Sequence, residues 1–423
     1  MPMPMPLPLP IPTEEPEDPS SSSLPPANYP PPSPIQLLPD DTLHHIFACL
    51  PLRETLASRS VCRHFHDALS SPSFLSLLPP LPLLALRHPR HHHHNYHLPP
   101  SLLAFDPSSS RWLRLSLSFV PFASLSPVTA SSSLLYLWAD PSPSSSSSDS
   151  KPPKSLILCN PLTRSFRILP PLGSAWSRHG TVLAAPAIAG SAVLVLTELA
   201  ALSYSPGAAS WRKFSLNLPS KPRSPVIIGA SIYALCDTGN PWRSQWKLFS
   251  CAIDDLGGPR GWAQLERHEW GDVFDILKRP RLVRGAGTSR ILMIGGLRSS
   301  FAVDAPCSTV LILRLDLGTL EWEEAGRMPP EMYRCFAGVG GQRTAAATAN
   351  AAGNNKVKVF GGEGRVWFSG KRVRGKMAMW EEEEEVEKCP GVGGTWKWVD
   401  GAPGYGDVVY RGFVFDAAAN EIS

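Results

Sequence analysis

The N-terminal segment has no basic residue before Arg53, although the chain carries 40 lysines and arginines in 423 residues. The charged residues of this segment are acidic, beginning with Glu14 and Glu15. A secretory signal needs a basic n-region, and an organelle transit peptide needs arginines without acids. We therefore expect neither an export signal nor a transit peptide.

The eight cysteines form no CxxC pair and show no zinc-type spacing; they stand at positions 49, 62, 159, 236, 251, 307, 335 and 389. In a chain without an export signal, reduced thiols are the usual state. The sequence therefore predicts a cytoplasmic and/or nuclear protein.

No hydrophobic run is long enough for a membrane span. The most apolar stretch, 182–202, is interrupted by Pro186, Gly190 and Glu198, whereas a spanning helix needs about 20 consecutive apolar residues. Two buried strands joined by an Ala-Gly-Ser turn explain it better, so no membrane partner is expected. The net charge of only +4 likewise argues against direct nucleic-acid binding.

Residues and motifs that could form an active site are also few. Ten of the twelve histidines lie at or before His97, which leaves only His179 and His268 beyond it. No GxSxG, P-loop or HExxH motif occurs. We therefore expect no catalytic residue, no metal and no cofactor; the histidine-rich segment 88–97 is interpreted as a low-complexity connector rather than a metal site.

Proline, by contrast, is abundant, with 46 residues, of which fourteen fall in the first 34 positions. Composition divides the chain into four regions. We predict a disordered Pro/Ser-rich tail at 1–34, a helical domain at 35–79, a Pro/His-rich linker at 80–100 and an all-β domain at 101–423.

Helical periodicity is sustained only in the second region. Asp40 is expected to cap a helix that carries Leu43, Ile46, Phe47 and Leu50 and ends at Pro51. A second helix is expected from about Arg53, and a third, with Phe65 and Leu69, before Pro72. Three short helices bury too small a core to be very stable alone.

The residues of this helical region also match a known sequence pattern. The segment LLPDDTLHHIFACLPLRETLASRSVCRHFHDALSSPSFLSLL resembles an F-box, with matches at Leu38, Pro39, Asp40, Leu43, Ile46, Leu50, Pro51, Leu56, Val61, Cys62, Arg63 and Phe65. Phe65 replaces the usual Trp of the Val-Cys-Arg signature. The alternative is a generic helical hairpin.

The β region repeats a cassette of strand, turn, aromatic and strand, which indicates a repeat architecture. The cassettes span 104–115, 158–172, 202–219, 250–265 and 313–329. Their aromatics are Trp112, Phe166, Trp211, Trp262 and Trp322, with Trp396 or Trp398 continuing the series. Most cassettes follow an apolar strand.

The paired glycines at 295–296 and 361–362 resemble those that end the second strand of a kelch blade. At some 54 residues per unit, the region would hold about six blades, within the range of β-propellers. The strand that closes the ring is expected from 410–423. A three-helix F-box followed by such a propeller resembles the plant F-box/kelch family.

The resemblance implies a substrate receptor of an SCF-type cullin–RING ubiquitin ligase. The F-box would dock on the SKP-family adaptor, and through it on cullin and RING subunits, while the propeller would hold a target protein. Adaptor contacts, or the core beneath them, are expected at Leu38, Pro39, Leu43, Ile46, Phe47, Leu50, Pro51, Leu56, Val61, Cys62 and Phe65. A non-degradative scaffold or transcriptional co-regulator is one alternative. A propeller enzyme, such as a copper-radical oxidase, is another.

Target binding is expected on the propeller face that gathers the loops between strands two and three and the links between blades. Exposed aromatic and arginine side chains make good interface anchors. The candidates are Trp176, Arg178, Trp242, Arg243, Phe301, Tyr333 and Arg334. The competing interpretation is that the aromatics belong to the core between blades. The glutamate run 381–385 is predicted to lie on a solvated loop.

Overall fold

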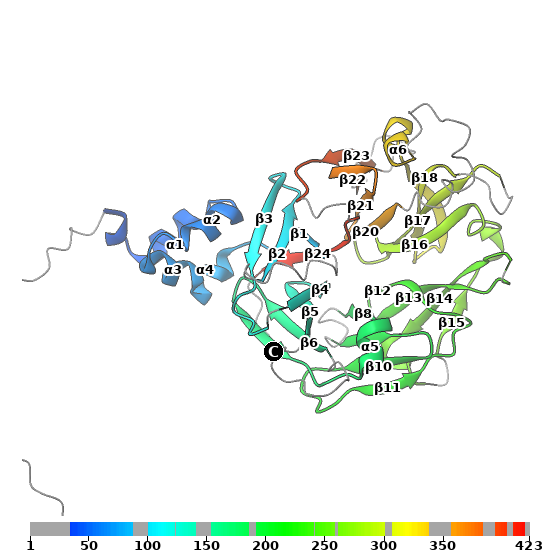
Figure 1. The fold of residues 1–423 in the computed structure, drawn as a ribbon, viewed down its shortest axis with the longest axis horizontal. Helices are drawn as coiled ribbons and strands as arrows, with labels where there is room; N and C mark the ends of the chain where they lie inside the picture. The colour runs from blue at the N-terminus through cyan, green and yellow to red at the C-terminus, as the bar shows by residue number, and fades with distance from the viewer. Residues whose placement is uncertain are drawn as a thin grey trace, which may run out of the picture.

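The structure is a computed structural model (Figure 1). It describes residues 34–87, 100–122, 124–140, 154–185, 192–240, 242–258, 261–300, 307–337, 357–383, 394–403 and 409–418. Within these segments, a small helical domain packs against one side of a ring of β-sheets. The tail 1–33, the histidine-rich segment 88–99 and the glutamates from position 384 onward lie outside the described residues.

The helical domain consists of a 3₁₀ turn and four short α-helices in the described chain. These are η1 (Pro34–Leu37), α1 (Asp40–Ala48), α2 (Leu52–Ser58), α3 (Arg63–Ser70) and α4 (Pro72–Leu77). The prolines Pro39 and Pro51 each stand immediately before a helix. The first N–H groups of a helix have no partner within the helix. Proline, which lacks an N–H, is therefore well tolerated at a helix start.

Two details of the helical prediction were wrong. Asp40 is the first residue of α1 rather than its cap, and Pro39, at the capping position, makes no side-chain hydrogen bond. Pro72 begins a fourth helix instead of only ending the third, because it occupies the first helical turn and Ser71 Oγ accepts a hydrogen bond from the Phe74 N–H at 3.2 Å.

The described strands form six four-stranded antiparallel sheets. Blade 1 is β24 (Gly412–Ala417), β1 (Leu81–Leu86), β2 (Ser101–Asp106) and β3 (Arg111–Ser116). Blade 2 is β4 (Ser124–Ser131), β5 (Leu134–Asp140), β6 (Ser155–Asn160) and β7 (Ser165–Ile168). Blade 3 is β8 (Thr181–Ala184), β9 (Val193–Leu196), β10 (Ala200–Tyr204) and β11 (Arg212–Ser215).

The second half of the ring follows the same order. Blade 4 is β12 (Arg223–Ile228), β13 (Ser231–Asp237), β14 (Trp246–Ala252) and β15 (Ala263–Leu265). Blade 5 is β16 (Leu277–Arg284), β17 (Arg290–Arg298), β18 (Cys307–Asp316) and β19 (Glu321–Arg327). Blade 6 is β20 (Lys358–Gly362), β21 (Arg365–Gly370), β22 (Val373–Glu382) and β23 (Gly394–Val399).

The ring closes through a shared blade, which confirms the predicted propeller and its closing strand. The C-terminal strand β24 pairs with β1 from Leu81↔Ala417 to Leu86↔Gly412. The first strand of each blade contacts the first strand of the next, in the order β24, β4, β8, β12, β16 and β20 and back to β24. These inner strands surround the centre of the ring in Figure 1.

Strand β1 corrects the predicted linker, which was to run from residue 80 to residue 100. Its sequence LPLLAL lies between two other strands, and its last four side chains are buried. The neighbouring prolines favoured a connector, but in the described residues β1 pairs with β2 only at Leu84 and Ala85. Pro82 therefore stands where the strand has β24 on one side alone, and an edge position tolerates the missing donor. The apolar run therefore outweighs the proline.

The repeated cassettes are the third and fourth strands of successive blades, and the sheets stack on their aromatics. Trp112 Nε1 donates to Asp400 O of the neighbouring blade at 3.0 Å, and Trp211 Nε1 donates to Pro170 O at 2.9 Å. Trp322 packs edge-on against Trp270 between blades 4 and 5. Phe166 is the exception, since 37% of it is exposed.

The two glycine pairs occupy different strands. Gly295 and Gly296 lie near the end of β17, a second strand, where a Cβ on Gly296 would stand 2.5 Å from Cys307 Sγ. Gly361 lies in β20, the first strand of its blade, and has a φ of +150°. The second pair therefore does not occupy the position that the kelch resemblance implied.

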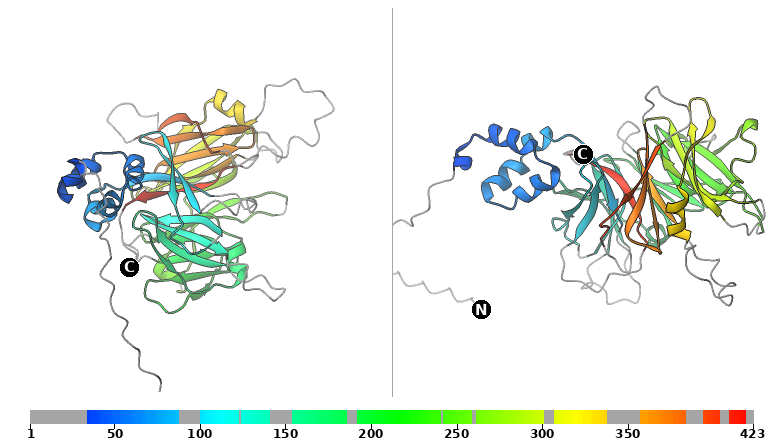
Figure 2. Two further views of the ribbon diagram at one scale, coloured as in Figure 1. Left: turned by 60° about the vertical axis from the view of Figure 1, so that its left-hand side comes forward. Right: turned by 90° about the horizontal axis from the view of Figure 1, so that it is seen from above.

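The ring has two faces, defined here by strand direction. The near face carries the β2–β3 and β6–β7 turns, and the far face carries the starts of the inner strands and the β13–β14 and β17–β18 connections. The links between blades, including α5 (Ser174–His179) and α6 (Pro330–Ala337), also lie on the far face. Figure 2 shows the helical domain on the opposite side of the propeller from α6.

The glutamate run begins inside the sheet rather than on a loop. Glu381 and Glu382 are the last residues of β22, and the Glu382 side chain is only 1% exposed. Its carboxylate accepts hydrogen bonds from Arg314 Nη1 at 3.0 Å and from the Ala286 N–H at 2.8 Å, both in blade 5. For these two residues the predicted solvated loop is wrong, because the carboxylate joins two blades. No helix in the described segments is long and apolar enough to cross a membrane.

Candidate functional site

The helical domain separates the predicted adaptor-binding residues into a core and a surface. Leu43, Phe47 and Phe65 are buried, and they pack with Leu69, Phe74 and Leu75. Leu38 and Cys62 are partly buried against the same cluster. These five predicted residues hold the helices together.

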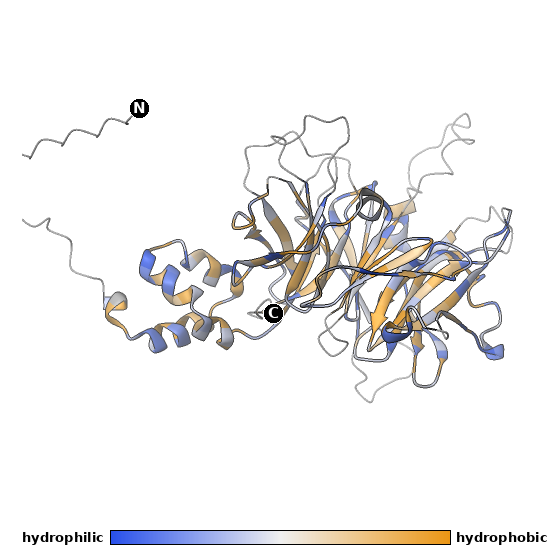
Figure 3. Cartoon of the chain, turned by 90° about the horizontal axis from the view of Figure 1, so that it is seen from below, coloured by the Kyte–Doolittle hydropathy of each residue, from blue (hydrophilic) through white to orange (hydrophobic). Residues whose placement is uncertain are grey.

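The surface group is apolar although it faces solvent. Pro39 and Pro51 are exposed, and 43% of Ile46, 36% of Leu50 and 69% of Val61 are accessible. Figure 3 shows both hydrophobic and hydrophilic colour on the helices of this domain. Burying such side chains in a partner is worth about 25 cal/mol per Å², so this surface is suited to docking.

Three further exposed apolar residues were not predicted from the sequence. They are Ile35, Leu37 and Leu77, with 40%, 69% and 46% of their surfaces accessible. Ile35 and Leu37 lie in η1, ahead of the expected first helix, and Leu77 lies in α4, the helix that was not anticipated. The hydropathy of Ile35 and Leu37 and their position just before Leu38 were the available signal.

Leu56 has a different environment from the other predicted residues. Together with Leu52 it packs from α2 against the core between blades 1 and 2. The helical domain is therefore seated on the propeller and not merely tethered to it. We call the contact between α2–α3 and the near face of blades 1 and 2 the joint.

At the joint, Arg59 is 5% exposed and reaches both domains. Its Nε and Nη2 donate to Leu69 O at 3.1 and 2.8 Å, within the helical domain, and its Nη1 donates to Leu162 O of blade 2 at 3.3 Å. Burial, and secondarily the charge of Arg164, lower the pKa of Arg59 to about 10. The side chain is still cationic at neutral pH, and among the described residues its hydrogen bonds go to carbonyl groups.

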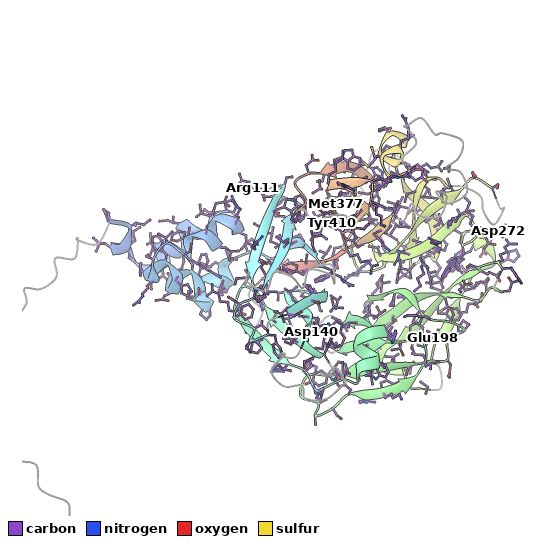
Figure 4. The ribbon with its side chains drawn as sticks, in the orientation of Figure 1. Arg111, Asp140, Glu198, Asp272, Met377 and Tyr410 are labelled. Carbon is purple, nitrogen blue, oxygen red and sulfur yellow. The ribbon has the colours of Figure 1, made fainter. Side chains whose placement is uncertain are left out.

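Two polar contacts flank Arg59 at the joint. Arg111 Nη1, at the start of β3, lies 2.8 Å from Glu54 Oε1, and Figure 4 labels Arg111 at the edge of blade 1 that faces the helices. Arg164 Nη1 lies 3.1 Å from His66 Nε2. Both pairs are exposed and contribute little energy individually, but they restrict the orientation of the helices.

The predicted target-binding residues divide into exposed and packed groups on the far face. Trp242 is the most exposed, at 85%, at the tip of the β13–β14 hairpin. The adjacent Arg243 pairs with Asp275 at 3.3 Å. Arg334 is exposed on α6.

The remaining candidates pack against the propeller or cannot be described. Trp176 packs against the core between blades 2 and 3, and Tyr333 packs against the core between blades 5 and 6. The Tyr333 hydroxyl donates to Cys307 O at 3.0 Å. The side chain of Arg178 and all of Phe301 lie outside the described residues.

Comparison with known proteins agrees with this architecture. The F-box domain model matches residues 35–77. The chain is 52% identical over 399 residues to SKP1-interacting partner 15 of Arabidopsis thaliana, covering 91% of this chain and 98% of the relative. It is 27% identical to the protein ABERRANT PANICLE ORGANIZATION 1 of Oryza sativa subsp. japonica, with 72% of each chain covered.

Among solved structures, the β-propeller domain of the trilobed protease from Pyrococcus furiosus aligns at a TM-score of 0.35 and 10% identity, over 67% of this chain and 72% of that one. The high identity to the Arabidopsis relative extends through both the helical domain and the propeller. Together with the matched F-box, it shows that the chain belongs to the plant F-box proteins of which SKP1-interacting partner 15 is a member.

Proposed function

We propose that this protein is the substrate-recognition subunit of an SCF-type ubiquitin ligase. Its F-box docks on an SKP1-family adaptor, which links it to cullin and RING subunits, and its propeller holds a target protein. The chain itself performs no chemistry. Its contribution is to hold the target near the conjugating machinery and so raise the effective concentration of the reacting groups.

The observation that carries this proposal is the apolar surface of the F-box. Leu37, Ile46, Leu50 and Val61 remain accessible after the helices have packed both on one another and on the propeller. An F-box with an unburied apolar face is suited to a protein partner. The name of the Arabidopsis relative, an SKP1-interacting partner, supports the identity of that partner for this chain.

Adaptor capture tests the proposal. Val61→Asp places a charge on the exposed face without disturbing the core, because 69% of Val61 is accessible. We expect it to weaken adaptor binding at least about tenfold, since a buried unpaired charge at an interface is costly. The matched control is Leu199→Asp, which alters a leucine that is 79% exposed in the β9–β10 turn on the opposite face.

The measurement is co-purification and titration of the full chain with an SKP1-family adaptor. The double variant Leu38→Ala/Pro39→Ala should also lose the adaptor, in this case partly because Leu38 packs against the F-box core. Unchanged adaptor affinity in Val61→Asp, or an equal loss in Leu199→Asp, would contradict the proposal.

We further propose that the protein acts in the cytoplasm and/or nucleus, the compartments predicted for a ligase of this type. A fluorescent fusion of the full chain checks this. Affinity capture under proteasome inhibition, compared between the normal chain and Val61→Asp, identifies the target. Proteins that bind the propeller should be retained by the variant and should have a longer half-life in cells that express it.

A further inference from the structure

The far-face ends of three inner strands carry a cluster of arginines. Arg223 begins β12, Arg279 and Arg281 lie in β16, and Arg411 immediately precedes β24. These are inner strands of three blades, and all four residues stand at or near the far-face end of their strands. We call these four residues the arginine cluster.

The backbone of two inner strands is irregular at the cluster. Pairing shifts register between Arg223 and Val226 in β12 and between Lys278 and Arg281 in β16. Within these bulges Ser224 and Arg279 have φ angles of +47° and +55°. A β-bulge redirects side chains and is common next to functional sites, and a non-glycine residue at positive φ carries strain.

Contacts between blades fix part of the cluster in place. Arg223 Nε donates to Pro280 O at 3.0 Å, and its guanidinium lies 5.0 Å from the centre of the Trp246 ring. Arg281 Nη1 donates to Ser224 Oγ at 3.3 Å. Arg223 and Arg281 thus link β12 and β16, whereas Arg279 and Arg411 remain exposed.

The positive charges of the cluster affect one another. Burial is the main cause that lowers the pKa of Arg223 to about 10, and repulsion from Arg281 and Arg279 lowers it further. The negative charge of Asp237 acts in the opposite direction and raises this pKa. Burial and repulsion from Arg411 lower the pKa of Arg281. The Asp237 carboxylate accepts hydrogen bonds from the Gln245 and Gly239 N–H groups of its own hairpin, at 2.9 and 3.0 Å.

At the near-face end of the inner strands, by contrast, an arginine has acidic neighbours. Arg284, at the near-face end of β16, pairs with Glu363 at 3.0 Å, and Asp416 lies nearby. In the part of the chain that the structure describes, no member of the arginine cluster forms an ion pair with a carboxylate. Gathering like charges without counter-ions is unfavourable, so an external anion would relieve a real energetic cost.

We propose that the arginine cluster binds an anionic segment of the target protein, whose carboxylate or phosphate groups supply the missing counter-charge. This inference rests on the proposed function, because it assigns the far face to the target. Arginine suits both groups, since its guanidinium can form two parallel hydrogen bonds with either. Trp242, which is 85% exposed on the same face, offers an apolar anchor for the same segment.

Fluorescence anisotropy of the full chain in complex with its adaptor tests the inference. The probes are three fluorescein-labelled peptides of equal length: one rich in glutamate, one with phosphoserines at the same positions, and one with glutamines there. We expect both anionic peptides to bind more tightly than the glutamine peptide and to weaken as salt rises. Tighter binding of the phosphoserine peptide than of the glutamate peptide identifies phosphate as the natural group. Equal binding of these two peptides identifies carboxylate as a sufficient group.

Variants locate the binding. Arg279→Gln with Arg411→Gln should weaken anionic-peptide binding at least about tenfold, because the variant cannot form two charge-assisted hydrogen bonds. The matched control is Arg114→Gln, an exposed arginine on the outer strand β3, which should change binding less than about twofold. Arg279→Lys keeps the charge but cannot form two parallel hydrogen bonds, so its affinity should fall between those of the normal chain and Arg279→Gln.

The outcomes separate this inference from the proposed function. If the adaptor binds normally but neither anionic peptide exceeds the glutamine peptide, the inference is wrong and the proposed function stands. Equal losses in Arg114→Gln and the double variant would also overturn it. So would tighter binding of a labelled DNA oligonucleotide than of either anionic peptide, since the ligand would then not be a protein segment. If the double variant unfolds, Arg411→Gln alone decides the result.

Discussion

The joint between the F-box and the propeller makes a quantitative prediction through Arg59. The change is Arg59→Met, which keeps an apolar stem of similar length and removes the guanidinium. Two carbonyl oxygens then lose their donors, Leu69 O in the F-box and Leu162 O in blade 2. The substitution therefore tests a side chain that serves both domains.

The magnitude follows from the hydrogen bonds that the variant cannot form. A hydrogen bond to a charged donor contributes about 1.5–3 kcal/mol, so two acceptors left without a partner cost about 3–6 kcal/mol. Removing the buried charge offsets part of this loss of stability, because the burial that lowers the pKa of Arg59 to about 10 also makes its charged form unfavourable. We expect a net loss of about 2–4 kcal/mol, most of what so small a helical unit can supply for itself.

Hydrogen exchange on the full chain measures the loss directly. Amides of α3, which ends one residue after Leu69, should lose protection roughly 30- to 1,000-fold in Arg59→Met, as expected for local opening of that free energy. The control is Arg53→Met in α2, the helix that ends just before Arg59; the Arg53 side chain is 59% exposed and contacts Glu54 at 3.8 Å. It should change protection only slightly. Equal protection of α3 in the two variants would refute the role assigned to Arg59.

Two further predictions concern the propeller. Glu382→Ala should lower the free energy of unfolding by about 3–5 kcal/mol, because it removes the buried carboxylate that bonds both Arg314 Nη1 and the Ala286 N–H. Urea unfolding measures this, and Glu324→Ala, at an exposed pair, should cost less than about 1 kcal/mol. Asp416→Asn should raise the melting temperature at pH 7, because burial raises the pKa of Asp416 and neighbouring Glu363 adds repulsion when both are charged. A raised carboxyl pKa means that the charged form costs stability above that pKa and nothing at acidic pH, so the difference between variant and wild type should shrink as pH falls toward 4. A variant that melts lower than wild type at pH 7 would show that pairing with Arg284 outweighs burial.

The F-box could be predicted from the sequence because its signal is local. Leu43 and Phe47 stand four residues apart in α1, Phe65 and Leu69 stand four residues apart in α3, and all four are buried. Strand β1 was missed because the prolines around it outweighed its apolar run, and helix α4 because Pro72 was taken only as a stop. In both cases the same residue type can begin an element or end one, and the packing partner decides which.

The joint and the arginine cluster were beyond prediction for a different reason. Arg59 bonds Leu162, which is 103 residues away, and Arg223 bonds Pro280, which is 57 residues away. Such contacts depend on the register of strands in different blades. Local periodicity contains no information about that register. Glu382 illustrates the same limit, because a run of glutamates in the sequence does not reveal which of them faces Arg314.

Strand direction explains why the two candidate surfaces lie apart. Strand β24 runs toward the near face, and β1 must run antiparallel to it, so β1 begins at the near face beside Ala417. Helix α4 ends at Leu77 and β1 begins at Leu81, which leaves too little chain to carry the F-box elsewhere. The F-box therefore does not cover the far face, where Trp242 and the arginine cluster lie. A target held there keeps a fixed relation to the adaptor only if the joint is stiff, because the effective concentration of tethered groups depends on geometry. The Arg59→Met variant should therefore lower the rate of ubiquitin transfer to the target more than it lowers the affinity for the adaptor.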